Sequence, residues 1–286
     1  SFGFALSPLV IIWSRTAVSD SLLCGTLGIS LLLFWKQFVE DKEKNNLLPW
    51  IVLSLAILTK GPVAGVIVSI TLILFLATQK DWKFLLFKIK PLRGILITFL
   101  ISFPWYLTIS IKEGKPFIDS FFGYHNLQRF TSVVNNHSEP WWFFINIMTI
   151  GSLPFSIFLF HGIFQTSKEL IINLKNGFKQ DDNLYLFALC WLLSVFIFFS
   201  FSATKLPRYW LPATPAAAIL ITKSASLLID KARDRSILWL LTILILLGFS
   251  IALFLSNTWI DLISDPEMPD LVNEIRISGL INNMRI

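Results

Sequence analysis

Residues 184–203 read Leu-Tyr-Leu-Phe-Ala-Leu-Cys-Trp-Leu-Leu-Ser-Val-Phe-Ile-Phe-Phe-Ser-Phe-Ser-Ala, a long run without a charged side chain. A helix needs about 20 mainly apolar residues to cross the hydrocarbon core of a bilayer. Comparable apolar runs recur along the chain, at 1–13, 17–35, 48–59, 62–78, 94–111, 143–164, 211–229 and 236–256. The sequence therefore predicts an all-α polytopic membrane protein, with about eight spans and a partial first one.

The composition supports this class of protein. Of the 286 residues, 55% are hydrophobic and only 15% are charged, which is far from the balance of a soluble domain. The formal net charge of +6 indicates anionic membrane lipid as a partner and does not indicate nucleic acid. Cys24 and Cys190 both lie inside apolar runs, so we expect them to be core residues without a disulfide.

The chain begins at Ser1 within an apolar run, without the charged segment or the cleavage site of a signal peptide. We expect it to be the interior of a longer protein whose first spans are missing. Residues 1–256 are expected to form the transmembrane helical domain, with an outer loop at 112–142. Residues 257–286 are expected to begin an outer C-terminal segment.

The basic residues are distributed unevenly between the two sides of the predicted bundle. If every apolar run crosses the membrane, one side receives the connections 36–47, 79–93, 166–183 and 223–235, which carry 15 of the 24 Lys and Arg residues. Cytoplasmic loops carry such an excess of positive charge, so this side is predicted to be cytoplasmic. The more varied polar residues then fall together on the opposite, outer side.

The central polar segment of the outer side is residues 121–142, which lie between two apolar runs. It contains a group of polar and charged residues that a site requires: His125, Asn126, Arg129, His137 and Glu139. The histidines suit a divalent metal or proton transfer, although no HxxH or HExxH spacing is present. A solvated loop that ends in an interfacial aromatic belt is the alternative interpretation.

Two charged residues stand at the ends of apolar runs. Asp20, with Arg15 shortly before it, opens the run 17–35, either as a residue that caps the helix start or as a carboxylate of a site. Lys60 separates two apolar runs, either with its ammonium extended to the interface or as a ligand for a phosphate. The helix start after Pro62 would add its own positive end to such a phosphate site.

A second strong stretch is residues 202–215, which contains three prolines and is therefore expected to be an irregular helix that lines a cavity or packs on protein. Lys205 and Arg208 present two cations near Tyr209, which suits a lipid-linked phosphate. The alternative is that these cations bind lipid headgroups, with Trp210 in the interfacial aromatic belt.

The sequence contains no P-loop, no Gly-rich dinucleotide turn and no Ser-His-Asp signature. A site on the outer side also has no access to cytoplasmic nucleotides, so no nucleotide cofactor is expected and the donor should already be carried on a lipid. A transporter or flippase of a lipid-linked or anionic solute is the main alternative, because the same cations would line its path. A structural scaffold would leave the one-sided clustering unexplained.

At these residues the chain resembles the polyprenyl-phosphate-sugar-dependent glycosyltransferases of GT-C architecture, which include the aminoarabinose lipid A transferases and the dolichyl-phosphate-mannose protein mannosyltransferases. The matching motifs occur in the order of that family and cover roughly residues 1–222. They are Arg15 with Asp20, Leu58-Thr-Lys-Gly-Pro62, His125-Asn-Leu-Gln-Arg-Phe130, His137-Ser-Glu-Pro-Trp-Trp142 and Lys205-Leu-Pro-Arg-Tyr-Trp-Leu-Pro212.

The resemblance implies a GT-C-like helix bundle in a bacterial inner membrane that transfers a sugar, with inversion, from a polyprenyl phosphate to a lipid, protein or envelope-glycan acceptor on the outer face. It implies that Lys60, Arg129, Lys205 and Arg208 hold the donor phosphate, beside Tyr209. Asp20 matches an acidic position near the acceptor, where it would be the catalytic carboxylate of this chain.

The resemblance also implies a possible divalent metal, which Asp20 would bind together with His125 or His137. One departure from the family pattern is important. The first outer loop of the family carries the acidic residue that is usually assigned as general base, and that region would precede Ser1. We therefore expect this segment alone to be inactive, with Asp20 not sufficient as the base.

Overall fold

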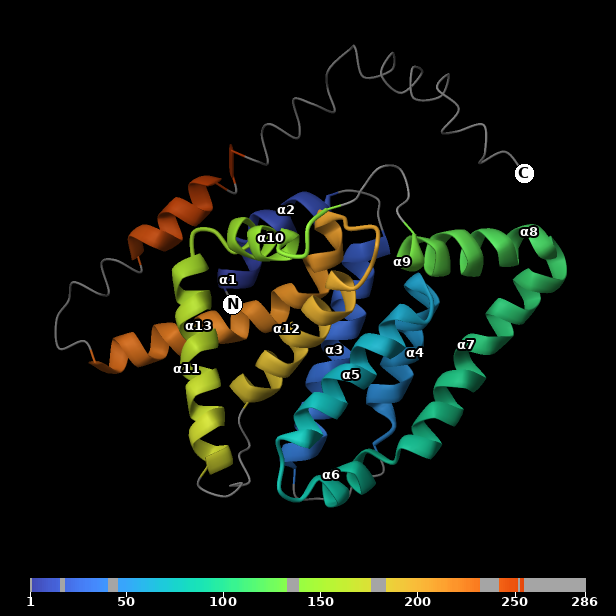
Figure 1. Ribbon diagram of the computed structural model, residues 1–286, viewed down its shortest axis with the longest axis horizontal. Helices are drawn as coiled ribbons and strands as arrows, with labels where there is room; N and C mark the ends of the chain where they lie inside the picture. Colours follow the sequence, from blue (N-terminus) through green and yellow to red (C-terminus); the bar gives the residue numbers. More distant parts are fainter. Residues whose placement is uncertain are drawn as a thin grey trace, which may run out of the picture.

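The computed structural model describes residues 2–15, 19–40, 46–132, 139–175, 184–231, 242–251 and 253–254. These residues form a bundle of helices (Figure 1). Their elements are α1 (Phe2–Ala5), α2 (Pro8–Ser14), α3 (Ser19–Val39), α4 (Leu48–Lys60), α5 (Val63–Ala77), α6 (Trp82–Ile89), α7 (Pro91–Glu113), α8 (Lys115–Phe117), the π-helix η1 (Ile118–Gln128), α9 (Arg129–Thr131), α10 (Phe143–Gly151), α11 (Ser156–Lys175), α12 (Leu184–Ser200), the 3-10 helix η2 (Pro207–Ala213) and α13 (Thr214–Lys231).

Among the described residues, two helical stretches are long and apolar enough to cross a membrane, Ser19–Val39 and Trp82–Glu113. The pair Phe143–Gly151 and Ser156–Leu174 passes the same test as one broken span. Shorter apolar helices form Leu48–Lys60, Val63–Ala77, Leu184–Ser200 and Thr242–Ile251. The prediction of an all-α polytopic membrane bundle is confirmed, and the runs predicted around α3, α4, α5, α7 and α12 coincide with helices.

The core lies where α3 packs against α4 and η2, and where α5 packs against α12. Aromatic rings fill it: Phe34 meets Trp50 edge to face at 4.9 Å between ring centroids, and Phe75 meets Phe187 in the same manner at 5.1 Å. Such pairs add to the stabilisation that comes from burying their area. Since lipid tails give helices no hydrophobic reason to associate, close packing of this kind holds the bundle together.

Close approach of helix backbones is visible where α11 crosses α13. A Cβ atom added at Gly162 of α11 would overlap the carbonyl group of Leu220 in α13, so only glycine fits this crossing. Polar side chains continue the same interface, because His161 Nδ1 lies 2.8 Å from Ser224 Oγ and Lys223 Nζ lies 3.0 Å from Glu169 Oε1. Small residues and hydrogen bonds therefore join α11 to α13, as is typical within membranes.

The span predicted at residues 143–164 is not one continuous helix. The chain leaves the helix between Gly151 and Ser156, and α10 and α11 are bent by 117°. Pro154 lies in this break, and a proline lacks the amide hydrogen that a continuing helix requires. Figure 1 shows α10 lying across the upper end of the bundle while α11 descends from it.

Two further segments differ from the expectation. Residues 1–13 form the two short helices α1 and α2 instead of the end of one span, because the Ser7 hydroxyl accepts the Val10 amide and Pro8 starts a new helix. In the segment 112–142, which was expected to be a loop, residues 115–131 are helical throughout α8, η1 and α9. The segment 257–286 lies outside the described residues.

Candidate functional site

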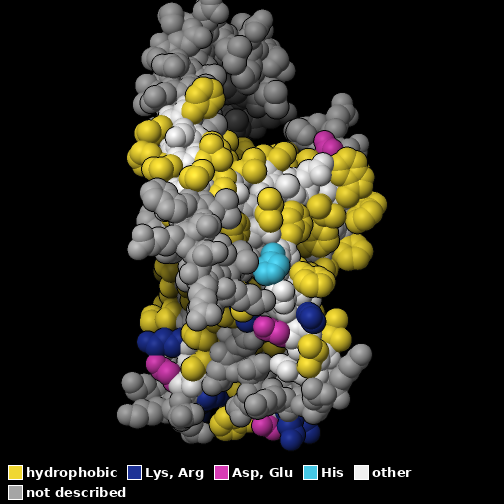
Figure 2. Space-filling model, turned by 90° about the vertical axis from the view of Figure 1, so that its left-hand side faces the viewer, with side chains coloured by type: hydrophobic (Ala, Val, Ile, Leu, Met, Phe, Trp, Pro, Cys, Tyr) yellow, Lys and Arg dark blue, Asp and Glu magenta, His cyan; other side chains and the backbone are white. Residues whose placement is uncertain are grey.

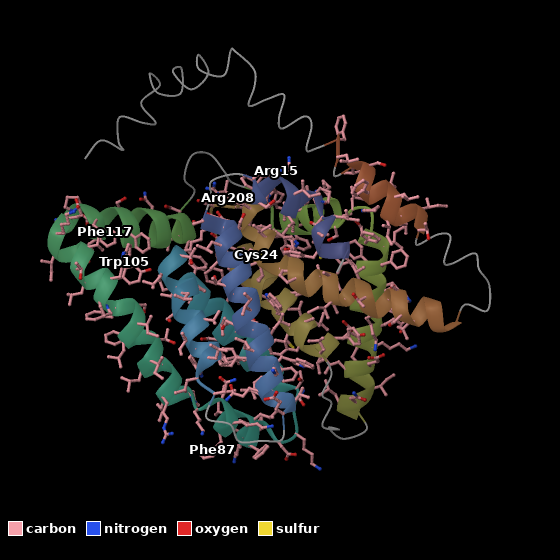
Figure 3. All side chains as sticks on the ribbon, turned by 180° about the vertical axis from the view of Figure 1, so that it is seen from behind. Arg15, Cys24, Phe87, Trp105, Phe117 and Arg208 are labelled. Carbon is pink, nitrogen blue, oxygen red and sulfur yellow. The ribbon has the colours of Figure 1, made fainter. Side chains whose placement is uncertain are left out.

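The candidate site lies at the upper end of the bundle in Figure 1, where α3 begins, α4 ends and η2 connects α12 to α13. Figure 3 shows Arg15 and Arg208 at this end, near the start of α3, and Cys24 further inside the bundle. The Cys24 thiol donates to the Leu211 carbonyl at 3.2 Å and so joins α3 to η2 below the site. Elements from three parts of the chain therefore build this end.

Asp20 is the acidic centre of the site. It lies in the first turn of α3, and its side chain is only 3% exposed. The Lys60 ammonium donates a hydrogen bond to Asp20 Oδ1, and Arg208 Nε lies 3.7 Å from Oδ2. The Asp20 carboxylate therefore forms ion pairs with two cations, Lys60 of α4 and Arg208 of η2.

Lys60 is the last residue of α4, and its side chain turns inward over the bundle. Its ammonium lies 5.0 Å from the centroid of the Tyr209 ring, close enough for a cation–π interaction. The Tyr209 ring is stacked on Phe199 of α12 at 4.8 Å, which holds its face toward the lysine. Gly61 ends α4 with φ of 84°, a backbone conformation that favours glycine and reverses the chain immediately after Lys60.

The segment after α12 is irregular, as its prolines predicted, and it forms the 3-10 helix η2. Trp210 is fully buried and contacts Phe144 and Phe196, so the alternative that placed it in an interfacial belt is wrong. Lys205 is only 8% exposed. A lysine so deeply buried loses much of its hydration, which makes the cation receptive to an anionic ligand.

Backbone contacts dock the helical segment 115–131 onto the same end. The Ala203 amide donates to the Phe130 carbonyl at 2.9 Å, and the Thr204 hydroxyl donates to the Ser132 carbonyl at 3.0 Å. The Phe130 ring also contacts Phe198 of α12 at 5.2 Å. These contacts bring the backbone around Arg129 beside the segment that carries Lys205.

The structure places the predicted site residues unequally. Asp20, Lys60, Arg208 and Tyr209 meet directly, and Lys205 lies in the segment that carries the last two. Arg15 caps the C-terminal end of α2 and is exposed, as is Glu139. The backbones of His125, Asn126 and Arg129 lie in η1 and α9, whereas their side chains and the whole of His137 lie outside the described residues.

Two residues that support the site, Thr204 and Phe199, were not predicted from the sequence. Thr204 and Phe199 have no local signal, since a threonine after a span and a phenylalanine within one are ordinary in any membrane protein. Thr204 could have been suspected from its place before Lys205, but its partner at Ser132 is set by tertiary packing. Their contribution is to position Lys205 and Tyr209.

The chain is similar in sequence to several known proteins. No family model matches it. It is 30% identical over 222 residues to an undecaprenyl phosphate-alpha-4-amino-4-deoxy-L-arabinose arabinosyl transferase of Proteus mirabilis, which covers 76% of this chain and 36% of that protein. The protein of the same name from Pseudomonas aeruginosa strain UCBPP-PA14 is 29% identical over 199 residues, 68% of this chain and 34% of the relative.

The fold agrees with these relatives. The crystal structure of ArnT from Cupriavidus metallidurans bound to undecaprenyl phosphate matches with a TM-score of 0.60 and 24% identity, over 79% of this chain and 40% of that chain. Its apo form matches with a TM-score of 0.61, 23% identity and 82% coverage of this chain. The chain has the GT-C glycosyltransferase fold.

A further relative is an uncharacterised protein of Aquifex aeolicus, which is 30% identical over 253 residues, 87% of this chain and 47% of that protein. The chain therefore spans less than half the length of the relatives that it matches. The roles of the site residues in this chain rest on the geometry given above.

Proposed function

We propose that this chain forms the donor-phosphate side of an integral-membrane glycosyltransferase that takes its sugar from a polyprenyl phosphate. The observation that carries the proposal is the meeting of Lys60 and Arg208 at the buried carboxylate of Asp20, with the buried Lys205 in the adjoining segment. These four side chains have a formal surplus of two positive charges. A dianionic phosphate monoester would neutralise that surplus, whereas a neutral sugar would not.

The names of the relatives support the same donor. The transferases of Proteus mirabilis and Pseudomonas aeruginosa are named for undecaprenyl phosphate-linked aminoarabinose, and the Cupriavidus metallidurans structure contains undecaprenyl phosphate. We propose a polyprenyl-phosphate-linked sugar as the donor of this protein too, together with a lipid, protein or envelope-glycan acceptor. No nucleotide cofactor is required because the sugar arrives already activated on its lipid phosphate.

In the proposed reaction, a hydroxyl oxygen of the acceptor forms a bond to the anomeric carbon of the sugar. The bond between that carbon and the phosphate oxygen breaks, and its electron pair remains on the polyprenyl phosphate. The configuration at the anomeric carbon inverts, and the proton of the hydroxyl passes to a general base. Lys60, Arg208 and Lys205 would stabilise the negative charge that grows on the leaving phosphate, with Arg129 as a fourth cation.

Asp20 has two roles in this proposal. It holds Lys60 and Arg208 in place by pairing with both, which reduces the reorganisation needed when the phosphate enters. Once the phosphate competes for these cations, the freed carboxylate would lie near the acceptor. Since Asp20 is engaged with two cations, we do not assign it as the sole general base.

A divalent metal at Asp20, His125 and His137 stays a proposal. Within the part of the chain that the structure describes, no group of three or more His, Cys, Asp or Glu residues is placed to hold a metal ion. Asp20, one of the three proposed ligands, already faces two cations, which would repel a divalent ion. The reaction above therefore contains no step that depends on a metal.

We propose that the site faces the outer side of a bacterial inner membrane. The predicted connections on the opposite side carry 15 of the 24 basic residues, as cytoplasmic loops do. Figure 2 shows one face of the molecule, on which Lys, Arg, Asp and Glu side chains are concentrated toward the lower end and hydrophobic side chains toward the upper part. The lower end is opposite to the candidate site.

The test is transfer from a radiolabelled polyprenyl-phosphate sugar in membranes that carry the complete protein. We expect Lys60→Ala and Lys205→Ala each to lower the rate of transfer by roughly a hundredfold, the size of effect seen when one charge-stabilising donor is removed. Lys112→Ala and Lys115→Ala are matched controls, since both lysines are exposed near the same end and should keep the wild-type rate.

Full activity of both site variants would exclude the phosphate role of these cations. A wild-type protein that transfers no sugar from any of several donors would instead favour the transporter. A transporter would move its solute through a path that opens alternately to each side, so Lys60→Cys would then react with a membrane-impermeant reagent from both sides of the membrane.

A further inference from the structure

The helix α6 lies at the lower end of the molecule in Figure 1, directly before α7 and far from the candidate site. One side of α6 is buried, because Leu85 and Ile89 belong to the hydrophobic core. The other side presents bulky rings: Phe87 is 67% exposed, and Trp82 and Phe84 are also exposed. Figure 3 shows Phe87 at the lower edge of the molecule.

Hydrogen bonds from neighbouring helices fix the orientation of α6. The buried ammonium of Lys88 donates to the Phe38 carbonyl at 2.9 Å, and the Gln37 side-chain amide donates to the Lys88 carbonyl at 2.8 Å. The Trp50 indole donates to the Ile89 carbonyl at 2.9 Å. Since α3 and α4 both hold α6, its exposed side is preformed and does not depend on a ligand.

The length of α7 places α6 at the level of the lipid headgroups. A helix of 23 residues such as α7 is about 35 Å long, which already crosses a hydrocarbon core of about 30 Å. Within the stretch Trp82–Glu113, the left-handed residue Lys90 (φ of 48°) separates α6 from α7. With α7 alone as the span, α6 precedes it and lies beyond the core, where Trp is enriched in membrane proteins. Exposed rings at that depth insert between lipid headgroups and acyl chains.

Cations accompany these rings. Lys80, Lys83 and Arg93 are exposed around α6, and none of them forms an ion pair with a carboxylate of the described residues. The segment 79–93 contains five basic residues and a single acidic one, Asp81. The Lys83 ammonium lies 5.5 Å from the centroid of the Trp82 ring, so cation and ring share one face of the helix.

We propose that this face binds the phosphates of anionic phospholipids. The α6 surface consists of exposed rings and exposed cations: Trp82, Phe84, Phe87, Lys80, Lys83 and Arg93. Its rings enter the interfacial layer, and its cations pair with anionic headgroups, which attract Lys and Arg close to a membrane surface. A zwitterionic headgroup offers each cation no net charge, so the surface distinguishes phosphatidylglycerol from phosphatidylcholine.

The experiment measures binding of phosphatidylglycerol and phosphatidylcholine to the purified protein in mixed micelles, by native mass spectrometry of bound lipid. We expect the wild type to retain phosphatidylglycerol preferentially. The double variant Lys83→Gln, Arg93→Gln should lose roughly 25-fold of its affinity for phosphatidylglycerol, which corresponds to about fivefold for each cation removed from a membrane surface.

The matched control is Lys112→Gln, Lys115→Gln, which removes the same net charge from exposed positions at the opposite end. It should keep the wild-type preference. An equal loss in both double variants would show a general effect of net charge and overturn the proposal, as would an unchanged preference in the α6 variant. Because Lys83 and Arg93 are exposed, the α6 variant should also keep the wild-type melting temperature, and a variant that melts earlier is replaced by Lys80→Gln, Lys83→Gln for the same comparison.

Discussion

Asp20 is a buried carboxylate whose charge is balanced by two cations from distant parts of the chain. Lys60 contacts one of its oxygens and Arg208 lies near the other. Burying a lone carboxylate costs far more than burying one that is paired, so the three residues depend on each other for stability as well as for any role in binding. A substitution at one of the three residues should therefore change the stabilising contribution of the other two.

We predict that Asp20→Asn lowers the free energy of unfolding by about 2 kcal/mol, because Lys60 and Arg208 lose the anion that compensates them. This is less than the cost of about 3–5 kcal/mol for a fully buried pair, since both cations keep part of their exposure to solvent. The double variant Asp20→Asn, Lys60→Gln should be less destabilised than the sum of its two single variants, since it removes both members of the pair. Thermal unfolding in detergent measures all three variants. Asp119→Asn is the control, because Asp119 is exposed, and strict additivity of the two single changes would disprove the coupling.

At the scale of elements, two prolines show that a proline in the sequence does not by itself determine whether a helix breaks. Pro154 lies in the break between α10 and α11, whereas Pro104 lies inside α7, which continues through it as one helix. Both removed a backbone donor, and only the packing of the surrounding helices determined whether the chain bends. Sequence alone therefore predicted an apolar span at 143–164 in the same way as at 94–111, and did not predict the break within it.

The turn between α4 and α5 offers an element-level prediction. Gly61 has φ of 84° and ψ of −162°, a region that is essentially limited to glycine. Gly61→Ala should therefore lower the free energy of unfolding by about 1–3 kcal/mol and displace Lys60 from Asp20.

The control for this change is Gly25→Ala, where an added Cβ meets nothing within 4 Å and the helix gains a better helix former. Thermal unfolding of both variants checks the prediction. A Gly61→Ala protein as stable as the wild type would show that this backbone conformation is not required.

At the scale of the whole molecule, the two ends of the bundle differ in character. The end with α2, α9 and η2 holds Asp20, Lys60 and Arg208, and the end with α6 holds an exposed surface of rings and lysines (Figure 1). This polarity follows from an alternating path of helices, because residues that follow every second span return to the same end. An orientation in the membrane can therefore be tested at two exposed lysines.

We predict that Lys115→Cys and Lys36→Cys react with a membrane-impermeant maleimide from opposite sides of the membrane. Both lysines are exposed, and the native Cys24 and Cys190 are buried, so background labelling should be low. Intact cells should label Lys115→Cys, whereas Lys36→Cys should be labelled only in inverted vesicles. Labelling of both variants from the same side would contradict the proposed orientation.

The sequence by itself determined the class of the protein and most of its helices. The reason is that the hydropathy of about 20 consecutive residues is a local property, and it decides whether a helix can cross the hydrocarbon core of a bilayer. The sequence also placed Asp20, Lys60 and Arg208 on one side of the membrane through the order of spans. Their contact was decided by tertiary structure, since the distance between a carboxylate and an ammonium 40 residues apart depends on how α3, α4 and η2 pack. The support from Thr204 and the fixed orientation of α6 were decided in the same way, because each rests on a partner that lies far away in the sequence.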